Sequence, residues 1–175
     1  LSIRRQRQMC IRDSKLREGK MDMSITGAEM CYHILKSSKV DYVFGSPGTT
    51  ELSILGEIAS DSEMKYLFVL HENVAVGMAD GFARASGHLG VANIHATQGT
   101  LNAAGFIRVA QRDNSSVLLI AGAPSTEYSF NEPNHFAYGI SHMIRNITKW
   151  SWEAQSPTQI PAILNRAINL ALSEP

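Results

Sequence analysis

The sequence predicts an α/β protein in which a mostly parallel sheet lies between two layers of helices. Short apolar runs, typical of buried strands, alternate along the chain with longer segments in which apolar residues recur every three or four positions, the spacing of a helix face. Strands that are separated by helices pair in parallel and are joined by right-handed crossovers, which gives a three-layer α/β/α sandwich. A chain of 175 residues is long enough to bury one core of ordinary size.

The expected elements begin after residue 24. Thr26 and Glu29 form a capping-box pattern, which predicts that a helix begins there and buries a face with Cys31, Ile34 and Leu35. The elements expected next are strand 41–44, a helix that carries Leu52, Leu55 and Ile58, strand 66–70, helix 72–86, strand 90–95, a helix that ends near Asn114, and strand 116–121.

The last third of the sequence is less regular. Residues 123–146 contain several turn-forming residues and are expected to be mostly loop, with one helix near 135–144. A short strand is expected at 147–150, and Pro157 opens an amphipathic helix. The alternation calls for another strand after this helix, so we expect a fragment that is truncated at its C-terminal end.

Basic charge is concentrated at the start of the chain. Residues 1–20 hold seven Lys and Arg against Asp13 and Glu18, whereas the remaining residues hold nine basic and fourteen acidic side chains. The two acidic residues and the missing apolar periodicity argue against a transit peptide, and the absence of aromatic residues argues against a nucleic-acid-binding arm. We interpret residues 1–20 as a non-native or disordered leader and residues 21–175 as one domain.

Cysteine usage and hydropathy indicate the class of protein. Cys10 lies in the leader, and Cys31 alone cannot form an intrachain disulfide framework or a paired-cysteine metal site. We interpret Cys31 as a small buried apolar residue. No apolar run is long enough to span a membrane. We therefore expect a cytoplasmic protein that binds neither nucleic acid nor a membrane.

Three strand-to-helix turns are expected to meet at one edge of the sheet, because open parallel sheets bind their ligands outside the carboxyl ends of the strands. These turns are 45–50, 71–73 and 95–100. Glu72 lies in the second turn, directly after an apolar strand. A carboxylate at that position either is the catalytic acid or fills the first turn of a helix, where the helix dipole attracts negative charge.

The other polar residues of these turns also have two interpretations each. Thr49 or Thr50 either caps the following helix or faces a substrate. His95, and with it His71, is either a hydrogen-bonded core residue or a catalyst. The sequence has no GxSxG elbow, no phosphate-loop lysine after Gly48 and no HExxH spacing, so neither a serine hydrolase nor a nucleotide site nor a metal site is expected.

At these turns the chain resembles the N-terminal, pyrimidine-binding domain of thiamine-diphosphate-dependent decarboxylases and carboligases. The resemblance covers about residues 24–175. It rests on three motifs in order, which are VFGSPGTTEL at 43–52, HE at 71–72 with GMADGFARASG at 77–87, and GTLNA at 99–103.

The resemblance implies definite roles for several of these residues. Glu72 would hydrogen-bond N1′ of the cofactor's aminopyrimidine ring, and the activated cofactor would attack the carbonyl of a 2-keto acid. This role requires Glu72 to be desolvated enough to share a proton with a weakly basic nitrogen. The implied cofactor contacts are Pro47, Gly48, Glu72, Gly99 and Asn102.

Within the family, the benzoylformate decarboxylase group is the most similar. The similarity lies in Asn93-Ile94-His95 and in Lys149–Glu153. It implies that His95 relays protons and contacts the substrate. It also implies that Thr49 contacts the substrate at a position where that group has serine, so the added methyl group changes the recognition of the substrate carboxylate.

Other parts of such an enzyme are not expected in this chain. In the family, Mg²⁺ and the diphosphate are held through a GDG motif in a C-terminal domain, and no such motif occurs here. The site forms between two subunits, which implies a homodimer or tetramer joined through the ligand edge and an inactive fragment. Two alternatives stay open: an acetolactate-synthase-like carboligase that also binds FAD, and a non-catalytic binding domain of the same fold.

Overall fold

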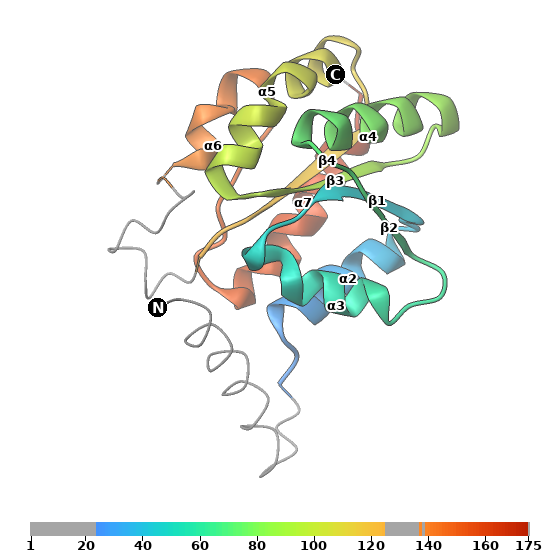
Figure 1. Cartoon of the computed structure of the whole chain (residues 1–175), viewed down its shortest axis with the longest axis vertical. Helices are drawn as coiled ribbons and strands as arrows, with labels where there is room; N and C mark the ends of the chain where they lie inside the picture. Colours follow the sequence, from blue (N-terminus) through green and yellow to red (C-terminus); the bar gives the residue numbers. More distant parts are fainter. Residues whose placement is uncertain (1–23, 125–136, 138, 175) are drawn as a thin grey trace.

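The computed structural model describes residues 24–124, 137 and 139–174. In this part of the chain, four parallel strands in the order β2-β1-β3-β4 lie between two layers of helices (Figure 1). The strands are β1 (Tyr42–Ser46), β2 (Lys65–Phe68), β3 (Gly90–His95) and β4 (Val117–Gly122). The helices are α2 (Gly27–Ser37), α3 (Leu52–Ala59), α4 (Glu72–Ser86), α5 (Ala96–Arg112), α6 (Ile140–Met143) and α7 (Ile160–Leu172), with short 3₁₀ turns η2 (Thr49–Glu51), η4 (Arg145–Ile147) and η5 (Pro157–Gln159).

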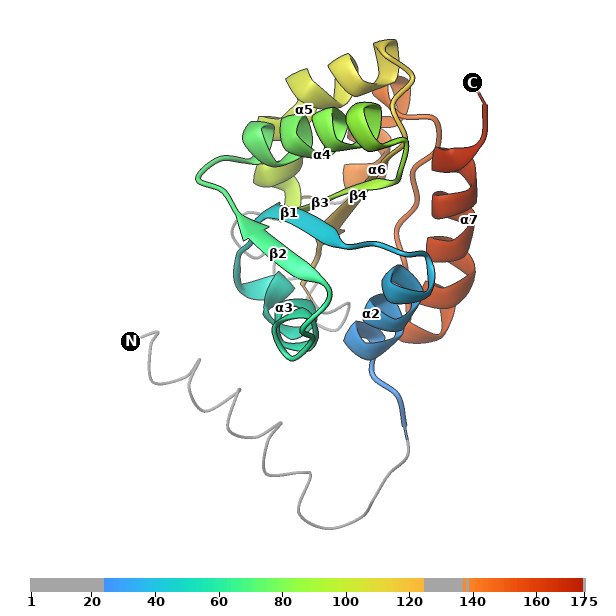
Figure 2. The same ribbon diagram turned by 90° about the vertical axis from the view of Figure 1, so that its right-hand side faces the viewer.

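Each face of the sheet has its own apolar core. Val43 of β1 points to the face covered by α2, α3 and α7, where Leu35, Ile58 and Leu164 pack together. The next residue, Phe44, points to the opposite face, which α4 and α5 cover. Figure 2 shows the two helical layers on either side of the strands. This alternation of side chains along each strand confirms the predicted three-layer sandwich.

Local sequence signals set the ends of several helices as predicted. Thr26 caps α2 in a complete capping box with Glu29, whose carboxylate accepts the N–H of Thr26 at 2.6 Å. Helix α4 covers residues 72–86 as expected and ends at Gly87, whose φ of +72° requires the left-handed conformation that glycine adopts readily. Pro157 opens the 3₁₀ turn that leads into α7.

The structure corrects two predictions about strands and turns. Strand 66–70 was expected to be buried, but β2 forms the edge of the sheet, so Phe68 is 65% exposed and Leu70, just beyond it, 90% exposed. No turn separates β3 from its helix, because α5 begins at Ala96, directly after the last strand residue, His95.

The predicted strand at 147–150 is also wrong. The segment forms the end of η4 and an irregular stretch. Lys149 explains this conformation, because its ammonium donates to the carbonyl oxygens of Leu170, Ser173 and Glu174 at the end of α7. The segment is therefore attached to a helix rather than paired with β4. The helix predicted near 135–144 is α6, but part of that range lies outside the described residues, as does the whole leader.

Candidate active site

A carboxylate–imidazole pair lies at the carboxyl ends of β1 and β3. Oε2 of Glu51 is 2.9 Å from Nδ1 of His95, and the hydroxyl of Thr50 is 3.1 Å from the same nitrogen. Because a carboxylate only accepts hydrogen bonds, this geometry assigns the hydrogen to Nδ1 and makes Nε2 the basic nitrogen of the neutral ring. The pair thus has the arrangement of a general acid–base group that is oriented by a buried anion.

Hydrogen bonds from the loop around Glu51 stabilise and orient this buried carboxylate. The Glu51 side chain is 1% exposed, whereas that of His95 is 23% exposed. Glu51 also accepts the backbone N–H of Gly48 at 2.8 Å and the hydroxyl of Thr50 at 2.7 Å. A buried carboxylate needs such donors to offset its lost hydration. The imidazole is therefore the part of the pair that solvent reaches.

Two glycines provide the space that this pair occupies. A Cβ atom on Gly48 would lie 2.3 Å from Nδ1 of His95, and one on Gly122 would lie 1.8 Å from Oε1 of Glu51. No side chain fits at either position without displacing the pair. Gly48, predicted as a cofactor contact, has this packing role against His95.

Glu72 forms a second group with two of the predicted cofactor contacts. It is the first residue of α4 and is half-buried. The side-chain amide of Asn102 donates to its Oε2 at 3.1 Å. A Cβ atom on Gly99 would lie 3.1 Å from Cγ of Glu72, so this glycine lets the glutamate lie against the first turn of α5. The structure thus brings together Glu72, Gly99 and Asn102, three of the residues predicted to contact the cofactor.

The remaining predicted residues have other positions. Thr49 is exposed at the start of η2, and neither it nor Thr50 caps a helix, because Gly48 precedes η2 and Glu51 precedes α3. Pro47 lies half-buried in the same loop. His71 is exposed and caps α4, since its Nδ1 accepts the N–H of Asn73 at 3.2 Å. The interpretation of His71 as a core residue was therefore wrong.

Glu51 is a residue of the candidate site that the sequence analysis did not predict. The only local signal was an acid shortly after a Pro-Gly turn, which is also what many helix N-termini contain. Cys31, interpreted as a small buried apolar residue, is only partly buried against the core, and burial raises the pKa of its thiol to about 11. Among the described residues, no cluster of three His, Cys, Asp or Glu side chains is arranged to hold a metal ion.

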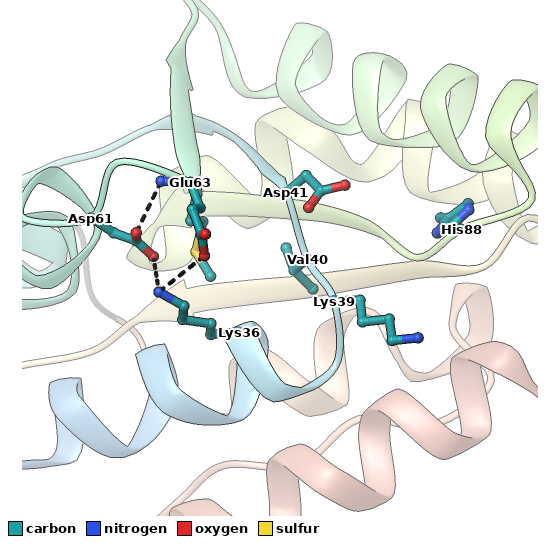
Figure 3. Close-up of a pocket in the computed structure, with 8 residues that line it drawn as sticks. Lys36, Lys39, Val40, Asp41, Asp61, Glu63 and His88 are labelled. Carbon is teal, nitrogen blue, oxygen red and sulfur yellow. Dashed lines mark hydrogen bonds and ion pairs between the residues drawn. The ribbon is translucent and has the colours of Figure 1, made fainter.

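Another hollow lies at the opposite end of the sheet, before the first residues of β1, β2 and β3. Figure 3 shows its polar lining, in which Lys36 is directed toward Asp61 and Glu63. The ammonium of Lys36 is 2.9 Å from Oδ2 of Asp61 and 3.4 Å from Oε2 of Glu63. The ammonium is therefore shared between the two carboxylates. Parallel sheets bind ligands at the carboxyl ends of their strands, so this hollow at the amino ends is not the candidate active site.

The comparisons with known proteins identify the family. The family model "Thiamine pyrophosphate enzyme, N-terminal TPP binding domain" matches residues 25–144. The chain belongs to the thiamine pyrophosphate enzymes. This family match confirms the resemblance at the three turns, and thiamine diphosphate is the cofactor of the domain.

Relatives among characterised proteins cover two activities. The benzoylformate decarboxylase of Pseudomonas aeruginosa is 34% identical over 144 residues, which is 82% of this chain and 27% of that protein. The acetolactate synthase isozyme 3 large subunit of Escherichia coli is 33% identical over 153 residues, 85% of this chain and 26% of that protein. The chain thus spans about a quarter of the length of these relatives.

Solved structures of thiamine pyrophosphate enzymes have the same fold. The benzoylformate decarboxylase of Polynucleobacter necessarius has a TM-score of 0.78 at 28% identity, over 84% of this chain and 27% of that one. The 4-hydroxybenzoylformate decarboxylase of Rhodococcus jostii has a TM-score of 0.79 at 28% identity, over 85% of this chain and 28% of that one. In residues 24–124 and 139–174, the structure has no helix with the length and hydropathy of a membrane span.

Proposed function

We propose that this domain is part of a 2-keto-acid decarboxylase or carboligase in which Glu72 activates thiamine diphosphate. The observation that carries the proposal is the position of Glu72 at the carboxyl edge of the sheet, held by Asn102 and placed against Gly99. The names of the relatives, benzoylformate decarboxylase and acetolactate synthase, support this class of reaction.

The residues around Glu72 fit the aminopyrimidine of the cofactor. Thiamine diphosphate, when bound, supplies a nucleophilic carbon and an electron sink for decarboxylation. Glu72 would hold a proton on its carboxyl group at the ring nitrogen N1′, and the Asn102 amide fixes the orientation of that carboxyl group. Pro47 and Gly48, from the neighbouring loop, would complete the contacts to the cofactor.

His95 and Thr49 would act on the substrate. The neutral imidazole, held through Nδ1 by Glu51, can accept a proton at Nε2 and, once protonated there, can return it. The exposed hydroxyl of Thr49 would contact the carboxylate of the 2-keto acid. Both residues are expected to affect decarboxylation more than they affect cofactor binding.

The same edge would contact the rest of the enzyme. Large apolar side chains are exposed there and on the adjoining faces of α4 and α5, among them Phe68, Leu70, Val74, Leu101 and Phe106. Exposed large apolar side chains of this kind indicate an interface with another part of the protein or with a partner. It supports a homodimer or tetramer in which a C-terminal domain, outside this chain, supplies Mg²⁺ and binds the diphosphate. We also propose a cytoplasmic location, since the family match is to a TPP-binding domain and the body of the chain has a single cysteine, as in reducing compartments.

An acetolactate-synthase-like carboligase with bound FAD is the second candidate. Its support is the 33% identity to the Escherichia coli enzyme. Flavin absorbance of the purified full-length protein, together with product analysis on pyruvate and benzoylformate, separates it from a decarboxylase. A non-catalytic domain would show neither product.

The direct test is Glu72→Gln in the full-length protein. We expect this variant to lose exchange of the C2 proton of bound thiamine diphosphate at neutral pH, measured by NMR after acid quench, while cofactor binding persists. Glu57→Gln, on the surface of α3, is the matched control and should exchange normally. Unchanged exchange in Glu72→Gln would refute the assigned role. His95→Ala should slow decarboxylation more than it weakens cofactor binding; equal losses would make His95 structural.

A further inference from the structure

Two side-chain hydrogen bonds cross the sheet just before the residues of the candidate site. The hydroxyl of Tyr66, on the edge strand β2, donates to Oδ1 of Asn93 on β3 at 3.0 Å. The side-chain amide of Asn93 in turn donates to the carbonyl oxygen of Ile120 on β4 at 3.1 Å. We call these two hydrogen bonds the Tyr66–Asn93 bridge. The bridge links three strands, because the order of the sheet is β2-β1-β3-β4.

A glycine of β1 lets the bridge pass. Strand β1 lies between β2 and β3, so the Tyr66 side chain has to cross it. It crosses at Gly45, where a Cβ atom would lie 1.8 Å from the Tyr66 hydroxyl oxygen and 2.8 Å from the backbone oxygen of Asn93. A side chain at this position would displace the hydroxyl. The bridge therefore depends on the glycine that precedes the Ser46–Gly48 turn.

The direction of each hydrogen bond in the bridge is fixed. A backbone carbonyl only accepts, so the nitrogen of the Asn93 amide must face Ile120, which leaves Oδ1 for the phenol. Burial and the charge of Glu51 raise the pKa of the Tyr66 hydroxyl, so the phenol keeps its proton and stays the donor. Asn93 is 1% exposed, and both ends of its amide have a partner. A fully satisfied polar network of this kind holds one geometry.

The bridge lies next to the strand ends that carry the candidate site. Asn93 and His95 are two residues apart on β3, so their side chains lie on the same face of the sheet. In the register of the sheet, Asn93 is opposite Gly45, one residue before β1 ends. The loop that follows β1 carries Glu51. The bridge thus ties together the two strands from which the members of the Glu51–His95 pair extend.

We propose that Tyr66 and Asn93 are positioning residues for His95. Their bridge fixes the spacing of β1 and β3 where both strands end, and this spacing sets the 2.9 Å contact between Glu51 and Nδ1 of His95. Without the bridge, the contact loosens and the ring loses its preference for a hydrogen on Nδ1. The effect on catalysis rests on the proposed function, in which His95 transfers protons at Nε2. The effect on the ring does not.

The test uses the full-length protein with nitrogen-15-labelled histidine at alkaline pH, where imidazole is neutral. The two ring nitrogens of His95, identified by their loss in His95→Gln, should have the well-separated shifts of a single tautomer. In Tyr66→Phe these shifts should converge. The kcat on benzoylformate or pyruvate should fall about tenfold or more, while KM and cofactor binding change less than about twofold.

Tyr32→Phe is the matched control. The Tyr32 hydroxyl donates to Oδ2 of Asp61 at 2.8 Å at the other end of the sheet, so this variant also removes one hydrogen-bonded phenol from the domain. It should leave the shifts of His95 and the kcat unchanged. A change that appears only in Tyr66→Phe therefore reports the position of the hydroxyl and not a general loss of stability.

A double-mutant cycle shows whether the two bridge residues act as one unit. Asn93→Leu breaks the bridge from its other end with a side chain of similar size, so it should change the ring and the kcat as Tyr66→Phe does. The double variant should be no worse than the more affected single variant, because the bridge can be lost only once. Either single variant decides the effect on the ring if the other does not fold.

Three results would overturn the inference. The first is a pair of His95 shifts that are already alike in the wild type or stay separate in Tyr66→Phe. The second is an equal convergence in Tyr32→Phe, and the third is a set of losses that add in the double variant. Failure of the proposed function gives another pattern. If the shifts converge while kcat is unchanged, or if the wild type decarboxylates neither acid, the bridge still positions the ring and the assigned role of His95 in the reaction is wrong.

Discussion

The carboxylate of Glu51 lies 2.9 Å from Nδ1 of His95, although the two residues are 44 positions apart in the chain. Their proximity follows from the pairing of β1 with β3, which brings the loop after β1 beside the last residue of β3. The carboxylate is buried and the imidazole partly exposed. This relationship determines how His95 presents its second nitrogen.

Replacement of Glu51 by glutamine should change the state of the His95 ring. The neutral amide no longer favours a hydrogen on Nδ1, so the preference for that tautomer should be lost, and stability should fall by about 1–3 kcal/mol because a buried charged hydrogen bond is removed. Nitrogen-15 shifts of the ring in the labelled chain report the tautomer directly. Glu57→Gln serves as control. If the His95 shifts do not move, the pair is not coupled.

Gly122→Ala should destabilise the domain although it adds only a methyl group. The new Cβ would lie 1.8 Å from Oε1 of Glu51, and overpacking of this kind costs about 1–3 kcal/mol. Gly81→Ala in α4 is the matched control, because no atom lies within 4 Å of its added Cβ. That change should stabilise the domain by about 0.5–1 kcal/mol, the helix preference of alanine over glycine. Urea unfolding of both variants measures the difference, and equal effects would contradict the prediction.

Ala96→Gly should be tolerated better than Ala110→Gly in the same helix. Both alanines are buried in α5, but Ala96 has a φ of +45°, which costs a residue with a Cβ about 1–2 kcal/mol. Glycine at position 96 relieves the cost of the positive φ, whereas Ala110 has no positive φ and so has no such cost to relieve. Unfolding free energies should therefore differ by at least about 1 kcal/mol between the two variants. The reverse order would show that Ala96 is not strained.

The stability of the domain should depend on Asp61 in acid. The backbone N–H of Glu63, the ammonium of Lys36 and the hydroxyl of Tyr32 hold the pKa of this carboxyl below its usual range. Its contribution is complete above the unfolded value of about 3.9 and is lost as the pH falls below it toward the lower native pKa.

Asp61→Asn should therefore lower the urea midpoint at pH 7, and the gap from wild type should shrink below about pH 4. Glu63→Gln, which changes an exposed ion pair, should have little effect. A gap for Asp61→Asn that is independent of pH would contradict the assigned cause.

Local patterns in the sequence were sufficient for much of the fold. The capping box at Thr26 and the apolar spacing after Glu72 act through neighbours a few residues away, so α2 and α4 begin where the sequence predicts. The grouping of Glu72 with Gly99 and Asn102 required the family motifs as well. The Glu51–His95 pair could not be predicted, because it depends on which strands are neighbours.

Two predictions, the buried strand at 66–70 and the strand at 147–150, were wrong because they depend on contacts between distant parts of the chain. An apolar run such as 66–70 has the same pattern in a central strand and in an edge strand, and β2 is an edge strand. Likewise, the conformation of 147–150 is determined by the contact of Lys149 with the end of α7, more than twenty residues away. Both features are tertiary and leave no signal in the local sequence.

The single turn of η2 places its first and last residues in opposite environments. Thr49 at its start faces solvent, whereas Glu51 at its end is enclosed on every side by Gly48, Thr50, His95 and Gly122. A substitution at position 49 therefore changes only the surface, whereas one at position 51 removes a buried acceptor of hydrogen bonds. One helical turn therefore separates a position that tolerates substitution from a position that the fold requires.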